Sequence, residues 1–213
     1  KQYPEAVIAF TESLKSIGYY GNLRLEGVVH RTMGDIYRAR YCYTNSYHEY
    51  RLAYGCFNIL QLPYHTYYTK YNMGQVAVKM HNYDEAEGLF IESRDYAIET
   101  SDMDFLCAVL HELCEIYLNQ GDYAKCKETL DMFEEYDCLL WFVSRYYAMR
   151  AIVSSEMGDN AEALQFVAQA EAEEYRDDAI IEDAKYHIYK NMGDADSALI
   201  WLERTNARLD EAL

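Results

Sequence analysis

Small residues recur along the chain at nearly constant intervals, and each is followed four positions later by a larger apolar residue. The small residues are Ala6, Ser46, Ala86, Cys126, Ala163 and Ala198, separated by 40, 40, 40, 37 and 35 positions. The larger residues are Phe10, Tyr50, Phe90, Leu130, Val167 and Leu202. A spacing of four places both members of a pair on one face of a helix, one turn apart. The pattern therefore predicts a helix around each small residue, with the larger residues filling the space beside it.

A second series of short stretches follows the same steps. The stretches are Met33–Tyr37 (MGDIY), Met73–Ala77 (MGQVA), Leu113–Tyr117 (LCEIY), Arg150–Ser154 (RAIVS) and Lys185–Tyr189 (KYHIY), and their starts differ by 40, 40, 37 and 35 positions. Two series that step together indicate a repeat array. Each repeat is expected to be an antiparallel pair of helices that buries its apolar face only by stacking on its neighbours.

The turns within the array share a pattern of their own. Gly121, Gly158 and Gly193 are each followed by an aspartate. A glycine can close a helix in the left-handed conformation, and the aspartate can then cap the next helix. Asn82 is expected to cap in the same way, whereas Arg40–Ser46 (RYCYTNS) lacks the glycine. With only 2 prolines, the chain is free to be helical throughout, so we predict an all-α fold.

The best-formed unit resembles the tetratricopeptide repeat. It runs from Cys107 to about Asp137 and carries Leu113, Tyr117, Gly121, Asp122, Tyr123 and Leu130. The resemblance implies a right-handed α-solenoid of stacked antiparallel helix pairs over one domain, 1–213. Its parts would be a half-unit at 1–17 and units near 27–66, 67–106, 107–143, 144–178 and 179–213. The set of lysines and asparagines that holds a terminal carboxylate in the best-known pockets of this family is not found.

Units of about 40 residues are longer than the usual repeat of about 34. Long-unit arrays of this kind resemble the sensory or assembly portions of bacterial regulators. The sequence begins inside a unit and ends without an obvious polar cap, which solenoids usually need. We therefore expect a fragment of a larger protein, with an output domain outside this segment.

The net charge of the chain limits the classes of molecule that it can be expected to bind. The 36 acidic residues against 19 Lys and Arg give a net charge of −17, which opposes direct binding of nucleic acid. No apolar run is long enough to span a bilayer, so no membrane contact by this segment is expected. The 6 cysteines form no CxxC pair and favour a reducing, cytoplasmic location. The alternative is the extracytoplasmic sensory portion of a membrane-anchored regulator.

The resemblance implies that the first helix of each pair lines a concave surface where partners bind. Helical spacing predicts the residues on its open face: Arg31, Asp35, Arg38, Tyr68, Tyr71, Gln75, Lys79, His111, Glu115, Asn119, Arg145, Ile152, Glu156, Asp183, His187 and Lys190. Arg and Tyr are enriched in recognition surfaces. One interpretation is a groove for an extended or helical acidic segment of a protein or peptide. The other is an ordinary solvated face.

No motif for catalysis is present. The sequence has no Gly-rich phosphate loop, no HExxH pair and no GxSxG elbow. Cys107, His111 and Cys114 have zinc-compatible spacing, but Cys114 stands at a packing position, so no metal or other cofactor is predicted. We predict a non-catalytic protein- or peptide-binding scaffold. The alternative is a ligand- or signal-peptide-sensing domain of a larger transcriptional or signalling regulator, and an enzyme or metal protein is the third reading.

Overall fold

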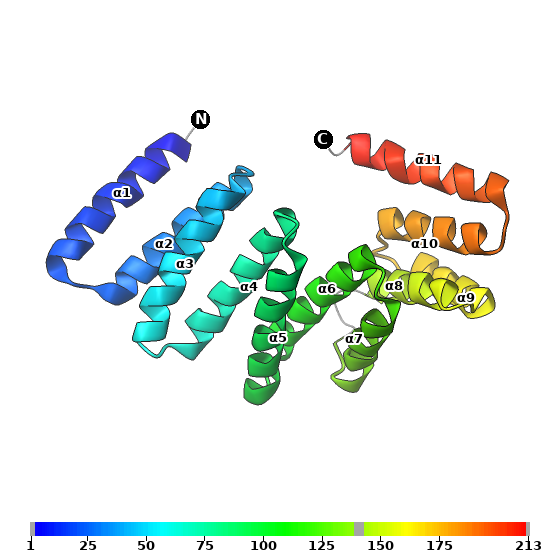
Figure 1. The fold of residues 1–213 in the computed structure, drawn as a ribbon, viewed down its shortest axis with the longest axis horizontal. Helices are drawn as coiled ribbons and strands as arrows, with labels where there is room; N and C mark the ends of the chain where they lie inside the picture. Colours follow the sequence, from blue (N-terminus) through cyan, green and yellow to red (C-terminus); the bar gives the residue numbers. More distant parts are fainter. Residues whose placement is uncertain (1–2, 139–142, 212–213) are drawn as a thin grey trace. The chain divides into compact units, whose positions relative to one another are not determined.

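The computed structural model describes residues 3–138 and 143–211, and these residues form eleven α-helices (Figure 1). The ends of the first and last predicted units lie outside the described residues. The helices are α1 (Tyr3–Tyr20), α2 (Leu23–Ala39), α3 (Tyr43–Ile59), α4 (Pro63–Lys79), α5 (Tyr83–Thr100), α6 (Met103–Gln120), α7 (Tyr123–Glu135), α8 (Val143–Glu156), α9 (Asn160–Ala172), α10 (Asp178–Asn191) and α11 (Ala195–Glu211).

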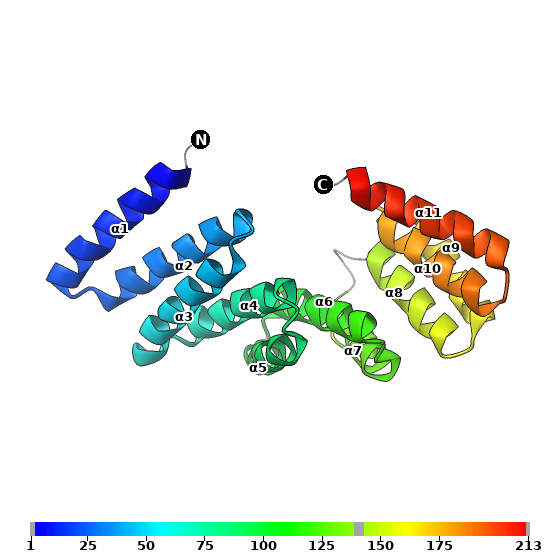
Figure 2. The ribbon, with the colours of Figure 1, turned by 45° about the horizontal axis from the view of Figure 1, so that its top comes forward.

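Helices that follow one another in the chain pack side by side. Contacts join α1 to α2, α2 to α3, α3 to α4 and α4 to α5, and later α7 to α8, α8 to α9 and α10 to α11. Figure 2 shows α8 to α11 gathered in one group, with α10 also contacting α8 and α9. The predicted all-α fold of stacked antiparallel helix pairs is confirmed.

The chain divides into two compact units, Lys1–Glu112 (unit 1) and Leu113–Leu213 (unit 2), with the boundary inside α6. Each unit has its own apolar core. In unit 1, Tyr50 packs with Met73 and Val76. In unit 2, Ala151, Val167 and Ile188 belong to one buried cluster. The single repeat domain over 1–213 stays a prediction.

In unit 2, the turns show the predicted helix capping. Gly121 has φ +71°, and the carboxylate of Asp122 accepts a hydrogen bond from the backbone N–H of Lys125 at 3.1 Å. Asp159 and Asp194 accept equivalent bonds from Glu162 and Ser197. The prediction for Asn82 was wrong, because its side chain does not cap α5 and instead donates to Glu85 Oε2 at 2.5 Å.

The expected small and large residues are buried in most repeats. In unit 1, the large residue of one helix also packs against a glycine of the other helix in the pair. A Cβ atom on Gly34 would lie 2.6 Å from the ring of Tyr50, and one on Gly74 would lie 2.6 Å from the ring of Phe90. Both rings are fully buried. The expectation fails for Leu202, which is 36% exposed because the described structure packs no further helix pair against α11.

Candidate binding sites

In unit 1, aromatic side chains line the open face of the first helices. Tyr68 and Tyr71 of α4 lie with ring centroids 6.2 Å apart, and Phe105 of α6 lies 5.8 Å from Tyr68 and 5.6 Å from Tyr71. The spacing of three places Tyr68 and Tyr71 on one side of α4. We call the surface formed by Arg31, Arg38, Tyr68, Tyr71 and Gln75, beneath which the buried ring of Phe105 packs, the aromatic face.

Hydrogen bonds tie the aromatic face to neighbouring helices. Arg38 of α2 donates to the side-chain oxygen of Gln75 on α4. Gln75 in turn donates to Glu112 Oε1 at 2.7 Å and to the hydroxyl of Tyr71 at 3.0 Å. Asp35 accepts from the hydroxyl of Tyr50 at 2.6 Å. Several predicted contact residues therefore already serve the packing of the repeat.

Arg31 is held differently from Arg38. Its guanidinium lies 5.9 Å from the ring centre of Phe57 and 5.8 Å from that of Tyr68, in cation–π geometry. It also lies 3.5 Å from Nδ1 of His65. Burial, followed by the charges of Arg31 and Arg24, lowers the pKa of His65, so a neutral imidazole can accept this bond. Within the described residues, Arg31 forms no ion pair with a carboxylate.

In unit 2, the open face of the first helices is hollowed into a cavity of about 520 Å³, which we call the acidic cavity. It is lined by Glu115, Leu118, Asn119, Tyr123, Arg145, Ile152, Asp177, Ala179, Ile180, Asp183, His187 and Thr205. Six of these were predicted from helical spacing: Glu115, Asn119, Arg145, Ile152, Asp183 and His187. Ile152 is only 3% exposed and belongs to the core at the edge of the cavity.

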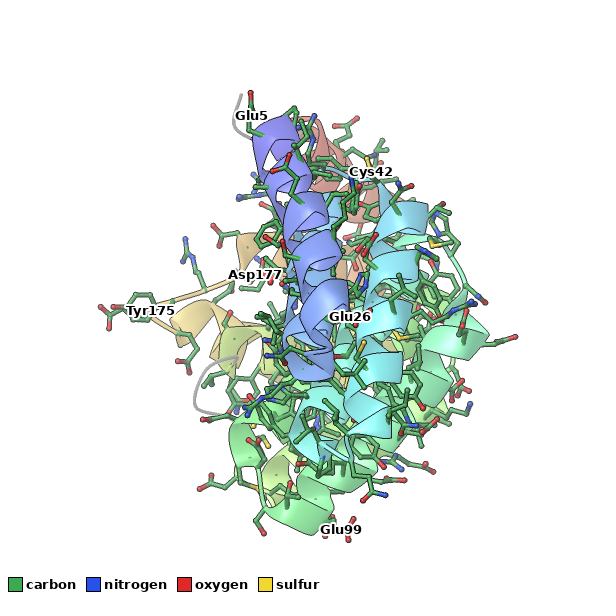
Figure 3. The ribbon with its side chains drawn as sticks, turned by 90° about the vertical axis from the view of Figure 1, so that its left-hand side faces the viewer. Glu5, Glu26, Cys42, Glu99, Tyr175 and Asp177 are labelled. Atoms are coloured by element: carbon green, nitrogen blue, oxygen red, sulfur yellow. The ribbon has the colours of Figure 1, made fainter. Side chains whose placement is uncertain are left out.

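Arg145 of α8 is clamped by two carboxylates of the acidic cavity. Its Nη2 lies 2.5 Å from Glu115 Oε1, and its Nη1 lies 3.0 Å from Asp177 Oδ2. Asp177 is also the N-cap of α10, accepting from the backbone N–H of Ala179 at 3.2 Å. Figure 3 shows Asp177 beside the helices, while Tyr175, in the same connection, projects away from them and is 89% exposed.

His187 of α10 stands between two further carboxylates. Its Nδ1 lies 2.5 Å from Glu156 Oε1, and its Nε2 lies 3.9 Å from Asp183 Oδ1. Burial would raise the pKa of Glu156, but hydrogen bonds from His187 and Asn191 hold it below its usual range. Because an ionised carboxylate only accepts, Nδ1 of His187 must carry the hydrogen.

Asp183 carries a charge that its surroundings do not favour. Burial raises its pKa; His187 opposes the shift and the charge of Glu115 adds to it. Burial also raises the pKa of Tyr123, with the charges of Glu156 and Asp183 adding to the effect. Burial is therefore the main reason that ionisation of both groups is disfavoured.

The remaining predicted residues lie at the margins of these two sites. Lys79 is exposed at the end of α4, and His111 is half-buried on α6. Lys190 is exposed, with Nζ 3.8 Å from Glu156 Oε1. As binding residues, all sixteen stay a prediction.

Helical spacing missed residues that come from outside the first helices or from their apolar positions. Phe105 stands at a buried position of its helix, and Asp177 precedes its helix. Tyr123 and Thr205 belong to the second helices of their pairs. The N-cap position of Asp177 was the one signal in the sequence that could have placed it at this surface.

The described residues carry little that suggests other chemistry. Among residues 3–138 and 143–211, no three His, Cys, Asp or Glu side chains are placed to hold a metal ion. In the same ranges, no helix combines the length and apolar character needed to cross a bilayer. All six cysteines are free, and only Cys42 is exposed.

No family model and no curated protein matches the sequence. Three solved structures are similar over nearly the whole chain. BtubC (BKLC) from P. vanneervenii is 15% identical with a TM-score of 0.67, covering 100% of this chain and 92% of that one. PilF from Pseudomonas aeruginosa is 16% identical with a TM-score of 0.60, covering 94% of this chain and 90% of that one.

The third similar structure is aspartyl phosphate phosphatase F from Bacillus subtilis. It is 12% identical with a TM-score of 0.69, and the match covers 99% of this chain but 58% of the phosphatase. At these identities the likeness is one of fold. The chain thus has a tetratricopeptide-repeat-like fold.

Proposed function

We propose that this chain is a non-catalytic scaffold that binds a protein or peptide through the open face of its first helices. One observation carries the proposal: residues chosen by helical spacing alone gather into an aromatic face in unit 1 and line a cavity in unit 2. Concave sites with a few convergent polar groups are the usual form of binding sites. The likeness to a phosphatase carries over no catalytic residue, because it is one of fold alone.

The aromatic face suits an extended or helical segment that contains acidic residues. Arg31 supplies a positive charge backed by the rings of Phe57 and Tyr68 rather than by a carboxylate. Arginine and tyrosine are enriched among the residues that dominate binding energy. A partner carboxylate could pair with the guanidinium while an apolar neighbour covers Tyr68, which is 36% exposed.

A selection from a library of short random peptides tests this proposal. Peptides enriched on the wild type are tested again on the double variant Arg31→Gln/Tyr68→Ala, with Arg94→Gln/Tyr175→Ala as the matched control at positions outside both sites. We expect the first variant to lose acidic peptides and the control to keep them, with unchanged helicity by circular dichroism in both. Peptides that bind both variants as well as the wild type would place binding elsewhere.

The acidic cavity supports a second candidate, a sensing domain whose ligand or signal peptide fills unit 2. A volume of about 520 Å³ falls within the range of about 300–1,000 Å³ for small-molecule sites. Native mass spectrometry of the purified protein tests it. A bound mass that is lost on substitution of a cavity residue favours sensing, and a ligand-free chain that captures a large partner favours scaffolding.

The free thiols fit a reducing compartment such as the cytoplasm. Five of the six cysteines are buried, where they act as small apolar residues. Within this proposal, the strongly negative net charge keeps a tyrosine-rich surface soluble. The chain has no need of bound metal or cofactor to recognise a partner in this way.

A further inference from the structure

The acidic cavity differs in charge from the aromatic face. Its lining holds three carboxylates, on Glu115, Asp177 and Asp183, but one permanent cation, Arg145. The carboxylates of the lining therefore outnumber its permanent cation by two. Its bases are also engaged, since Arg145 bridges Glu115 and Asp177 and His187 bonds Glu156. An acidic ligand would meet repulsion here rather than attraction.

We propose that the acidic cavity binds the side chain of an arginine carried by a peptide or protein segment. This inference rests on the proposed function, because it names the chemistry of the partner at one of the two sites. The guanidinium would donate to the carboxylate of Asp183, whose side chain lines the cavity and is 43% exposed. Guanidinium presents five N–H donors in a fixed fork, which suits several acceptors at once.

The cavity already shows how it holds such a group. The guanidinium of Arg145 is bound by Glu115 and Asp177 at 2.5 and 3.0 Å, and both contacts come from different helices than its own. Asp183 has no arginine or lysine partner among the described residues, and Nε2 of His187 lies 3.9 Å from its Oδ1. Burial raises the pKa of Asp183, which His187 opposes and the charge of Glu115 reinforces.

Apolar groups beside these acceptors suit the remainder of an arginine. Leu118, Ile152 and Ile180 line the same cavity. The methylene stem of an arginine packs on apolar surface while its charged end reaches polar groups. A lone metal ion fits less well, because no group of three metal-ligating side chains is found among the described residues.

The test uses three short peptides that share small flanking residues and carry arginine, citrulline or glutamate at the centre. Citrulline has the shape of arginine without its charge. Binding to the whole chain is measured by ligand-observed NMR and by displacement of a labelled arginine peptide. We expect the wild type to bind the arginine peptide about tenfold more tightly than the citrulline peptide, and the glutamate peptide least.

Two isosteric variants make the result specific to the cavity. Asp183→Asn should remove the preference for arginine over citrulline. Asp196→Asn, which makes the same change on an exposed position of α11 outside the cavity, should keep it. Circular dichroism and unfolding curves check that both variants are folded.

Three outcomes overturn the inference: no binding of the arginine peptide, equal binding of arginine and citrulline peptides, or a preference that survives Asp183→Asn. These outcomes leave the proposed function separately testable. If random peptides without basic residues bind and are lost when cavity residues are substituted, the scaffold proposal stands and the arginine inference fails. If no peptide depends on either site, both fail.

Discussion

The two compact units are built from the same helix pairs, but the turn that joins the two helices of a pair contains different residues in each unit. Unit 2 uses Gly121, Gly158 and Gly193 at positive φ, whereas unit 1 places Tyr41 and His81 there, at φ 60° and 59°. An L side chain in this conformation costs about 1–2 kcal/mol. The turn is therefore favoured locally in unit 2 and is imposed on unit 1 by the packing of the flanking helices.

The units also fill the space between paired helices differently. In unit 1, Gly34 and Gly74 receive the rings of Tyr50 and Phe90. At the equivalent places in unit 2, Ala151 and Val167 lie in one buried cluster. A larger residue on one helix is thus matched by a smaller one on the other, as close packing requires.

Their open faces show a third difference. In unit 1, aromatic rings lie on the open face, and hydrogen bonds such as that from Gln75 to Glu112 join its helices. Unit 2 leaves a cavity whose carboxylates outnumber its permanent cations. The same helical positions thus carry two different surfaces, for which we propose acidic partner groups in unit 1 and basic partner groups in unit 2.

The largest effect on stability is expected when the volume of one pair is changed. Gly74→Ala places a Cβ 2.6 Å from the buried ring of Phe90, and overpacking of this kind costs about 1–3 kcal/mol. Urea unfolding should show a lower midpoint. Gly88→Ala is the control, because its Cβ would meet nothing within 4 Å and alanine favours a helix by about 0.5–1 kcal/mol.

A second change sharpens this prediction. Replacing Phe90 by leucine in the Gly74→Ala chain gives unit 1 a pairing closer to those of unit 2. We expect the double variant to be more stable than Gly74→Ala alone. Equal unfolding midpoints for Gly74→Ala and Gly88→Ala would contradict the idea that glycine is needed there for close approach.

An intermediate effect is expected when the turn residues are exchanged between the units. Gly121→Ala should lower the free energy of unfolding by about 1 kcal/mol, because the alanine has space but must adopt the left-handed conformation. Tyr41→Gly should stabilise by about 0.5–1 kcal/mol, less whatever the edge contact with Tyr43 contributes. Thermal unfolding measures both. Tyr41→Ala loses the ring but keeps the strain, so stabilisation by alanine as well would rule out relief of strain as the cause.

The smallest effect is expected from Asp183. Because its pKa is raised in the folded chain, the native state keeps this proton to a higher pH than the unfolded state does. The ionised carboxylate therefore costs stability above the raised pKa, and this cost disappears as the pH falls through it. Asp183→Asn should raise the unfolding free energy at neutral pH by less than about 1 kcal/mol, since the side chain is 43% exposed.

Unfolding curves at neutral and mildly acidic pH check this sign. The gain from Asp183→Asn should shrink on acidification, while Asp196→Asn should show no such trend. A loss of stability at neutral pH would mean that Asp183 supports the fold. That result would contradict the proposal that Asp183 is present for binding and lowers the stability of the fold.

The sequence by itself determined the helix pairs, because their signals are local. A small residue, a large residue one turn later and a Gly-Asp turn report on one helix and its cap. These signals located most of the helices around Ser46, Ala86, Cys126 and Ala163. They also selected six of the residues that line the acidic cavity, because helical spacing decides which side chains share a face.

Only the tertiary structure decided what those faces can bind. The bases seen along the sequence suggested a surface for acidic segments, but Arg145 is neutralised by Glu115 and by Asp177, more than thirty positions away in the chain. The left-handed turn at Tyr41 has no local signal and follows from the helices on either side. Charge pairing and burial depend on contacts between distant segments, and spacing along one helix does not encode them.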